Sequence, residues 1–314
     1  MPPADRSPSA VTDQPGSVAG LAIAVLGAGR MGSAMASTLA RAGAAVTVYN
    51  RTRARADELA ARIQARVAAS PAEAAEGADV VITMVADDDA VRTLYREPGG
   101  VLDGLSGRTI GVDMSTVLPD TVRSLADDVR ARGAGLLDAP VSGSVSLAEA
   151  GTLTIMAGGD ARDLERARPA LEALSSRIFH VGPLGAGATM KLAVNAIVFG
   201  LDASIAEALV LAEKAGVDRE LAYDVFAAST FRSPFVDYKR DAFLDPDGTP
   251  VAFSVGLAQK DLRLILELAG RAGAPMPQAE TNLQVLTDTA GDIGAERDFS
   301  AVAVHLRRGR TGMA

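Results

Sequence analysis

The sequence has no cysteine and only two histidines among 314 residues, His180 and His305. The absence of cysteine excludes disulfides, thiol catalysis and cysteine-based metal sites, and it suits a reducing cytoplasm. Two histidines leave almost nothing for a histidine-rich metal centre or a Ser-His-Asp triad. We expect a cytoplasmic protein without a metal site, with His180 in a structural role and His305 on the surface.

An excess of basic charge is also missing. The net charge is −8 and the pI is near 4.9, whereas a duplex-binding protein normally carries a basic face. Residues 1–19 are rich in Pro, Ser and Asp, which predicts a disordered tail and not a signal peptide. The longest apolar run, 192–212, contains Asn195, Asp202 and Glu207, so we expect a buried soluble helix there. Neither nucleic acid nor a membrane is an expected partner.

The first half of the chain alternates short apolar runs with helical patterns. A hydrophobic content of 48% is ample for a packed core. Strand-helix alternation predicts a doubly wound, mostly parallel sheet with helices on both faces. We expect strands at 21–26, 45–49, 80–85, 109–113, 135–138, 153–157 and 177–181, and helices at 31–42, 53–62, 121–132 and 161–174.

Strand signals stop after Gly187. Helical patterns then follow at 188–214, 218–229, 254–272, 277–290 and 299–309, and the segment 231–235 is expected in a loop. The boundary falls near the Gly-Pro-Leu-Gly sequence at 182–185. We therefore predict a tail at 1–19, an α/β Rossmann domain at 20–184, and an all-α domain at 185–314 for substrate binding and oligomerisation.

A nucleotide-binding pattern opens the α/β half. The strand from Ile23 leads into Gly27-Ala-Gly29-Arg-Met-Gly32, the pattern G-x-G-x-x-G, and a helix follows. Gly27 permits the tight turn, Gly29 lets a pyrophosphate approach the backbone, and Gly32 lets helix and strand pack closely. The N-terminus of the helix then offers free N–H groups to the phosphates.

The end of the second strand indicates which dinucleotide binds. NAD sites usually place an acidic residue about 20 residues after the glycines, to accept a hydrogen bond from the ribose. Here neutral Asn50 takes that place, and Arg51 and Arg53 follow. An arginine can clamp a 2′-phosphate that a carboxylate would repel, so we predict NADP(H). These two segments supply predicted cofactor contacts at Gly27, Gly29, Arg30, Met31, Gly32, Asn50, Arg51 and Thr52.

A lysine and an amide open the helical half. Lys191 and Asn195 follow a glycine-rich turn and lie four residues apart, so they share one helix face. Reduction of a carbonyl group by hydride requires a proton at its oxygen, and a lysine can donate one. Burial would lower the lysine pKa from its usual value of about 10.4 and let the residue both donate and accept a proton. Asn195 can donate one hydrogen bond and accept another.

Several segments, in order, resemble the 3-hydroxyisobutyrate dehydrogenase-like β-hydroxyacid dehydrogenases. After the glycine-rich opening come Asp-Met-Ser-Thr at 113–116, Asp-Ala-Pro-Val-Ser-Gly-Ser at 138–144 and Gly-Thr-Leu-Thr at 151–154. The pattern Gly-x-Gly-x-x-x-Lys-x-x-x-Asn follows at 185–195, and Lys-Asp-Leu at 260–262. The similarity extends from about residue 21 to the end of the chain.

This resemblance implies roles for particular residues. Lys191 would be the general acid/base and Asn195 would help to hold the substrate. Ser142 and Gly143 would bind the substrate carboxylate, and Met84, Val85, Thr116 and Lys260 would line the cofactor. The family usually has a second glycine at position 144, so Ser144 would narrow the carboxylate site or add a donor.

Three functions fit these patterns. The first is an NADPH-dependent reductase of a small semialdehyde or oxo acid, acting reversibly on the hydroxy acid. The second is an imine reductase, a class that resembles this architecture but usually carries Asp or Tyr in place of Lys191. The third is a non-catalytic NADPH-binding protein, which would be expected to lose the lysine-amide pair. The long apolar helix predicts a homodimer or homotetramer that buries its excess apolar face.

Overall fold

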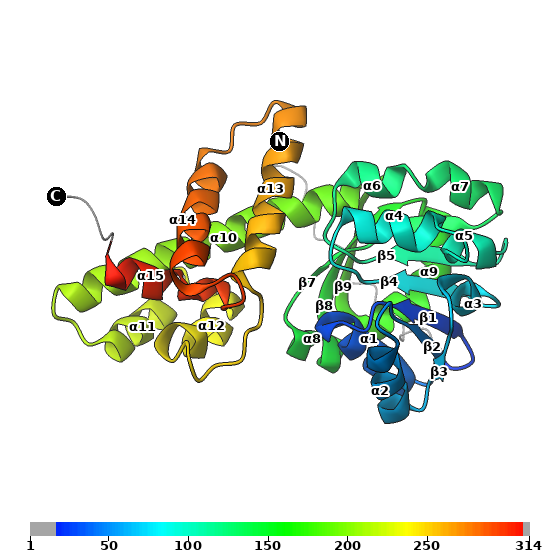
Figure 1. Ribbon diagram of the computed structural model, residues 1–314, viewed down its shortest axis with the longest axis horizontal. Helices are drawn as coiled ribbons and strands as arrows, with labels where there is room; N and C mark the ends of the chain where they lie inside the picture. Colours follow the sequence, from blue (N-terminus) through cyan, green and yellow to red (C-terminus); the bar gives the residue numbers. More distant parts are fainter. Residues whose placement is uncertain (1–16, 310–314) are drawn as a thin grey trace, which may run out of the picture.

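The chain folds into an α/β half and a helical half that are joined by one long helix, α10 (Ala186–Lys214) (Figure 1). The structure is a computed structural model and describes residues 17–309. Residues 1–16 of the expected tail lie outside the described part. Val18 is buried, and its carbonyl oxygen accepts a hydrogen bond from the Leu21 N–H at 3.0 Å, so residues 18–21 belong to the folded part.

Within residues 17–309, nine strands form one sheet in the order β3-β2-β1-β4-β5-β6-β8-β7, with β9 also paired to β8. The strands from β1 to β6 run parallel. Strand β1 lies between β2 and β4, which places a topological switch point at its carboxyl end, where open α/β sheets bind ligands. The bounds are β1 (Ala22–Leu26), β2 (Ala45–Tyr49), β3 (Arg66–Val67), β4 (Val80–Thr83), β5 (Ile110–Asp113) and β6 (Gly135–Asp138).

The remaining strands change the direction of the sheet. Strand β8 (Leu153–Gly159) is antiparallel to β6 and to β7 (Val141–Ser142), and β9 (Ser175–Gly182) is parallel to β8. The prediction of a mostly parallel sheet is confirmed. The two-residue strands β3 and β7 were not predicted, because two residues are too few to show an alternating pattern.

Helices cover both faces of the sheet. Ile23 and Val25 of β1 point into one core, while Ala24 and Leu26 point into the other. One core is closed by α1 (Arg30–Arg41), α2 (Arg53–Ile63) and α9 (Ala161–Leu174). The opposite face carries α3 (Pro71–Ala75), α4 (Asp88–Arg96), α5 (Val101–Gly104), α6 (Pro119–Arg123) and α7 (Ala126–Ala131).

One predicted helix of this half is wrong as a single element. The segment 121–132 belongs to two helices, α6 and α7, which are separated at Ser124 and Leu125. The Ser124 hydroxyl donates to the Thr121 carbonyl oxygen at 2.7 Å, and the Leu125 N–H bonds to Val122 three residues back. These tighter local bonds compete with the regular helical ladder. The short helices α3, α4 and α5, and α8 (Val145–Ala150) after β7, were not predicted either.

The helical half packs five further helices and a short 3-10 turn around α10. Phe199 of α10 stacks edge-on against Phe299 with 5.8 Å between ring centroids, in a core that also contains Leu118 of the α/β half. A helix begins at Pro234, inside the segment that was expected to be a loop. It can begin there because the Ser233 hydroxyl caps it by accepting a hydrogen bond from the Val236 N–H. The bounds are α11 (Arg219–Ala228), α12 (Pro234–Leu244), α13 (Val255–Ala272), α14 (Pro277–Ile293), η1 (Phe299–Ala301) and α15 (Val302–Arg308).

Helix α10 is long and apolar enough to cross a membrane by length and composition alone. Two of its polar side chains, Asn195 and Asp202, are however buried against the protein, whereas Glu207 is exposed. Asn195 lies against α13, and the carboxylate of Asp202 accepts a hydrogen bond from the Ser300 hydroxyl at 2.9 Å. Buried polar groups with hydrogen-bond partners inside the fold are typical of a protein core.

Candidate active site

The glycine-rich turn connects β1 to α1 and leaves open space at its centre. Gly27 has a φ of +114°, and a Cβ there would lie 2.2 Å from the Met84 carbonyl oxygen. A Cβ on Gly32 would lie 1.9 Å from the Gly27 oxygen, whereas one on Gly29 would meet nothing within 4 Å. Two glycines are therefore needed for packing, and the third leaves room for a phosphate at the start of α1, as a dinucleotide site requires.

Asn50 holds this turn against the end of β2. Its Oδ1 accepts from the Ala28 N–H at 2.9 Å, and its Nδ2 donates to the Thr52 carbonyl oxygen at 2.9 Å. The amide thus joins the glycine-rich turn to the β2–α2 loop. A cofactor contact by Asn50 stays a prediction, and the structure gives the side chain a bracing role that the sequence did not reveal.

Exposed arginines surround this turn. Arg30 begins α1, and Arg51 lies just before Thr52, the residue that precedes α2. Within residues 17–309 neither Arg30 nor Arg51 has a hydrogen-bond or ion-pair partner, whereas Arg53 pairs with Asp57 at 3.0 Å. The Thr52 hydroxyl does not cap α2, whose first turn has no acidic residue. The start of α2 is therefore positively charged and suited to an anion.

A buried hydrogen-bond network orders the ends of β4 and β5, where Met84, Val85 and Thr116 lie. The Val85 N–H donates to Ser115 Oγ at 3.0 Å, and that hydroxyl donates to Asp113 Oδ1 at 2.9 Å. Thr83 Oγ1 donates to the same oxygen at 2.6 Å. Burial raises the pKa of Asp113 to about 6, against these hydrogen bonds. The network fixes two loops that were predicted to contact the cofactor.

Lys191 and Asn195 meet the cofactor half through α13. Asn195 Nδ2 donates to Asp261 Oδ2 at 2.7 Å, and Lys260 Nζ lies 2.6 Å from Asp261 Oδ1. Lys260 Nζ also donates to the Thr116 carbonyl oxygen at 2.7 Å. A continuous polar chain therefore runs from Asn195 through Asp261 and Lys260 to the nucleotide half. Lys260 therefore contacts the backbone of Thr116, which was predicted to line the cofactor, and its own contact with the cofactor stays a prediction.

The surroundings of Lys191 set its proton affinity. The side chain is half-buried, and burial lowers the pKa of Lys191 to about 8. The Asp261 carboxylate opposes this shift and the Lys260 ammonium adds to it. In the sequence, Asp261 stands out only as the neighbour of Lys260. Its buried contact with Asn195 spans 66 positions in the chain, and no local pattern signals such a contact.

The predicted substrate loop lies on β7 and the start of α8. Ser142 pairs with Thr154 of β8. Gly143 has a φ of +143°, and a Cβ there would lie 2.7 Å from Leu153 Cδ2. The Ser144 hydroxyl accepts from the Leu147 N–H at 3.4 Å and bonds the Ser146 hydroxyl at 2.7 Å. Ser144 therefore caps α8, a role that was not foreseen beside its expected contact with the carboxylate.

Helix α8 is in turn fastened to the cofactor helix. Thr38 Oγ1 of α1 donates to the Ala148 carbonyl oxygen at 2.8 Å, and the Arg41 guanidinium donates to the Glu149 carbonyl oxygen. Hydrogen bonds thus link the loop predicted to hold the substrate to the helix predicted to hold the phosphates.

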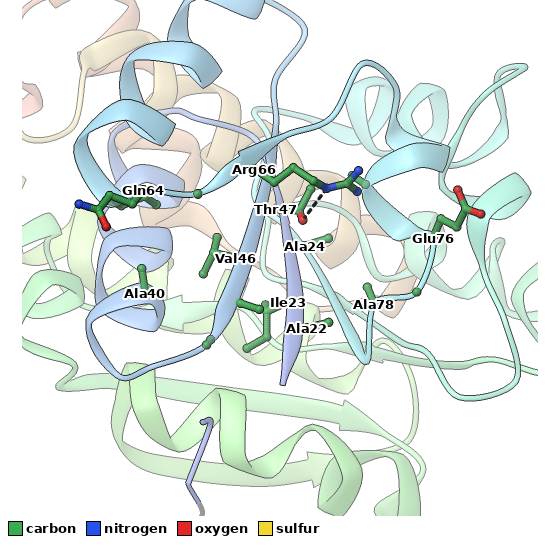
Figure 2. A pocket seen from close by; sticks show the side chains of 16 residues that line it. Ala22, Ile23, Ala24, Ala40, Val46, Thr47, Gln64, Arg66, Glu76 and Ala78 are labelled. Carbon is green, nitrogen blue, oxygen red and sulfur yellow. Dashed lines mark hydrogen bonds between the residues drawn. The ribbon is translucent and has the colours of Figure 1, made fainter. Parts of the chain in front are cut away.

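A groove of about 660 Å³ lies at the other end of the sheet (Figure 2). It is lined mostly by small side chains near the amino ends of β1 and β2, together with Gln64, Arg66 and Glu76. Arg66 donates from Nε to Thr47 Oγ1 at 3.3 Å. None of the predicted site residues lines it. Ligands of open α/β sheets bind at the carboxyl ends of the strands, so this groove is separate from the candidate site.

Comparisons with known proteins agree with this arrangement. The family described as "NAD binding domain of 6-phosphogluconate dehydrogenase" matches residues 22–182, and the family described as "NAD-binding of NADP-dependent 3-hydroxyisobutyrate dehydrogenase" matches residues 185–306. The chain is 36% identical to NAD-dependent L-serine dehydrogenase of Pseudomonas aeruginosa over 89% of its own length and 96% of that protein. It is 34% identical to 3-sulfolactaldehyde reductase of Escherichia coli over 91% and 96% of the two chains.

Solved structures give the same result. The 3-hydroxyisobutyrate dehydrogenase of Mycobacterium tuberculosis with L-serine is 34% identical, with a TM-score of 0.79 over 91% of this chain and 98% of the other. An imine reductase from Pseudomonas sp. is 24% identical with a TM-score of 0.60, a similarity that concerns the fold alone. With both halves matched and a nucleotide site joined to a lysine-amide pair, the chain belongs to the 3-hydroxyisobutyrate dehydrogenase-like family of β-hydroxyacid dehydrogenases.

Proposed function

We propose that the protein is an NADPH-dependent oxidoreductase that interconverts a small semialdehyde or oxo acid and its hydroxy acid. The observation that carries this proposal is the polar chain from Asn195 through Asp261 and Lys260 to Thr116. It joins the helix that bears Lys191 to the edge of the nucleotide site. A substrate between these groups would have a proton donor on one side and a nicotinamide on the other.

Lys191 handles the proton. A bound nicotinamide cofactor supplies or accepts the hydride. Lys191 donates a proton to the carbonyl oxygen as negative charge develops on it, and removes a proton from the hydroxyl group in the reverse direction. A pKa of about 8 keeps the amine largely protonated at neutral pH and still lets it act as a base. One group can therefore serve both directions.

Asn195 has a defined orientation for this task. Its Nδ2 is directed to the buried Asp261 carboxylate, which turns Oδ1 the other way, where it can accept a hydrogen bond. A substrate hydroxyl or the Lys191 ammonium is a suitable donor. Asp261 thus selects which end of the amide faces the reaction.

Small polar groups on the predicted substrate loop support a substrate that carries an anionic group. Ser142 and Gly143 lie on the loop fastened to α1, and we assign them to a carboxylate or a similar anion. The names of two relatives, a serine dehydrogenase and a sulfolactaldehyde reductase, are consistent with a short substrate that carries a hydroxyl or carbonyl group beside an anion.

The preference for NADPH rests on Arg51, with Arg30 as a second cation. Both are exposed and have no partner within residues 17–309. A 2′-phosphate at the start of α2 would meet the Arg51 guanidinium and the helix N-terminus together. The helical half also matches a family described as NADP-dependent, although one relative is an NAD-dependent enzyme.

We further propose a homodimer or homotetramer and a cytoplasmic location. Ile197 and Leu211 of α10 are 72% and 71% exposed, and Leu221 and Val225 of α11 are 58% and 59% exposed. Apolar faces of this kind are typically buried between subunits. The cytoplasmic location stays a prediction from the cysteine-free sequence.

A substrate panel tests the proposal and separates its rivals. Purified protein is mixed with NADPH and with succinic semialdehyde, glyoxylate or a five-membered cyclic imine, and the NADPH absorbance is followed. We expect turnover of at least one semialdehyde or oxo acid. Turnover of the imine alone would favour an imine reductase. NADPH binding without turnover of a broad aldehyde, oxo-acid and imine panel would favour a non-catalytic binding protein.

A further inference from the structure

Asp138, the last residue of β6, caps the helix that carries Lys191. Its side chain is 1% exposed. Asp138 Oδ1 accepts from the Gly185 N–H at 2.7 Å, and Oδ2 accepts from the Ala188 N–H at 2.7 Å. Helix α10 has no cap of its own, because Gly185 precedes it without a side chain and its first turn contains no acidic residue. Unpaired N–H groups at a buried helix start are costly, so this carboxylate completes α10 from another element.

The approach of α10 to the sheet is very close at this point. A Cβ on Gly187 would lie 2.3 Å from the Met156 carbonyl oxygen and 2.5 Å from that of Asp138. A Cβ on Gly158 would lie 2.5 Å from Asp138 Oδ1. The two glycines let the carboxylate and the helix start meet, and they leave α10 little freedom to slide.

Asp138 also lies close in sequence to the predicted substrate loop, and its hydrogen-bond partner Ala188 lies close to Lys191. Ser142 of the substrate loop follows it by four residues, and Lys191 follows Ala188 by three. Residues three apart share a helix face, and side chains lean toward the helix N-terminus. Resting on the proposed function of Lys191, we propose that Asp138 is a positioning residue that places Lys191 against the substrate loop and raises its proton affinity.

The negative charge of Asp138 supports the proposed effect on the proton affinity of Lys191. Asp138 places a buried negative charge at the start of α10, where it offsets the partial positive charge of the helix N-terminus. A negative charge also favours the protonated form of a lysine close to it. Asp138 itself faces Arg123 of α6 and its register neighbour Asp113 on β5, while Lys191 faces Asp261 and Lys260 of α13. Replacing Asp138 by a neutral residue removes negative charge from this set, so Lys191 should lose its proton at lower pH.

The test is Asp138→Asn, compared with Asp218→Ala. Asp218 caps the exposed start of α11 by accepting from the Leu221 N–H at 2.9 Å, so its loss removes a helix cap away from the site. Turnover is normalised to NADPH-binding sites to correct for unfolded protein. We expect Asp138→Asn to lower kcat by about 10- to 100-fold, as a misplaced group does, and to move the alkaline limb of the reductive profile to lower pH. Asp218→Ala should lower only the melting temperature.

A second readout does not depend on turnover. Acetylation of Lys191 by acetic anhydride, followed by peptide mass spectrometry across pH, reports where this amine deprotonates. Asp138→Asn should move that midpoint to lower pH, even if no substrate is found and the proposed function fails. If Asp138→Asn does not fold, Asp138→Ser, which keeps one acceptor, is measured in the same way. Wild-type kcat with an unmoved midpoint would overturn the proposal.

Discussion

Lys191 owes its proton affinity to burial and to two charged neighbours. Because its pKa is about 8, the amine loses its proton within the range in which enzymes are assayed. Reduction needs the protonated amine, so kcat/KM for reduction should be level below pH 8 and fall about tenfold per pH unit above it. Oxidation needs the neutral amine and should rise up to pH 8 and then level off. Initial rates in both directions, measured across pH, check this.

The same prediction has an internal control at Asp261. This carboxylate raises the pKa of Lys191, so Asp261→Asn should move both pH limbs to lower pH. If both limbs of the pH profiles stay in place in Asp261→Asn, a group other than Lys191 sets them.

Arg51 should decide between the two dinucleotides. Arg51→Ala removes a charge-assisted contact worth roughly 1.5–3 kcal/mol, so the KM for NADPH should rise by about 10- to 100-fold. The KM for NADH should not change, because NADH has no 2′-phosphate. Arg62→Ala, in the last turn of α2 and away from its start, is the control. An unchanged KM for NADPH in Arg51→Ala would remove the basis for NADP preference.

The two kinds of site residue differed in how far the sequence could reveal them. The glycine-rich turn and the Lys191–Asn195 pair follow from local spacing, so the sequence alone was enough to predict both. The Asn195–Asp261 bond joins two helices, and the Thr83–Asp113 and Val85–Ser115 bonds join the ends of two strands, between residues distant in sequence. Periodicity and propensity carry no information about such pairs, and the capping role of Ser144 likewise depends on α8, a helix too short to be predicted.

Among the elements, length decided which could be predicted. Strands β2 and β6 and helix α9 lie at the predicted residues, because each shows a full run of apolar or periodic positions. The missed elements are mostly four to six residues or two-residue strands, and their form depends on tertiary packing. Helices α4 and α12 are the longer exceptions, with nine and eleven residues, and the sequence predicts a loop where α12 begins at Pro234.

The start of α10 should tolerate no side chain at Gly187. Gly187→Ala would push a Cβ into two backbone carbonyl oxygens, and such overpacking costs about 1–3 kcal/mol. We expect a lower melting temperature and, because α10 carries Lys191, reduced turnover. Gly200→Ala on the same helix is the control, since its Cβ would meet nothing closer than 3.9 Å. It should be neutral or stabilising by up to about 1 kcal/mol. Equal stability of the two variants would contradict the close packing.

Both the α/β half and the helical half contribute residues to the candidate site. Lys260 of the helical half donates to Thr116 of the α/β half, and Leu118 packs into the helical core. The family matches also change between residues 182 and 185, beside the start of α10. The exposed apolar positions of α10 and α11 are the basis of the proposed contact with a second copy.

Light scattering should find a dimer or tetramer at micromolar concentration. The chain has a mass of 32.2 kDa, and the measured mass should be two or four times that value. Ile197→Glu places a charge on a 72% exposed apolar position and should shift the assembly toward monomer while NADPH binding is kept. A wild-type protein that is only monomeric would contradict the predicted assembly.

The central claim is that Lys191 supplies the proton in an NADPH-dependent reduction. The most direct measurement compares Lys191→Ala with the wild type on the best substrate of the panel, with NADPH binding followed by cofactor fluorescence. Loss of a general acid should lower kcat by about 10²- to 10⁴-fold, while the dissociation constant for NADPH stays the same. Wild-type turnover in Lys191→Ala would contradict the claim.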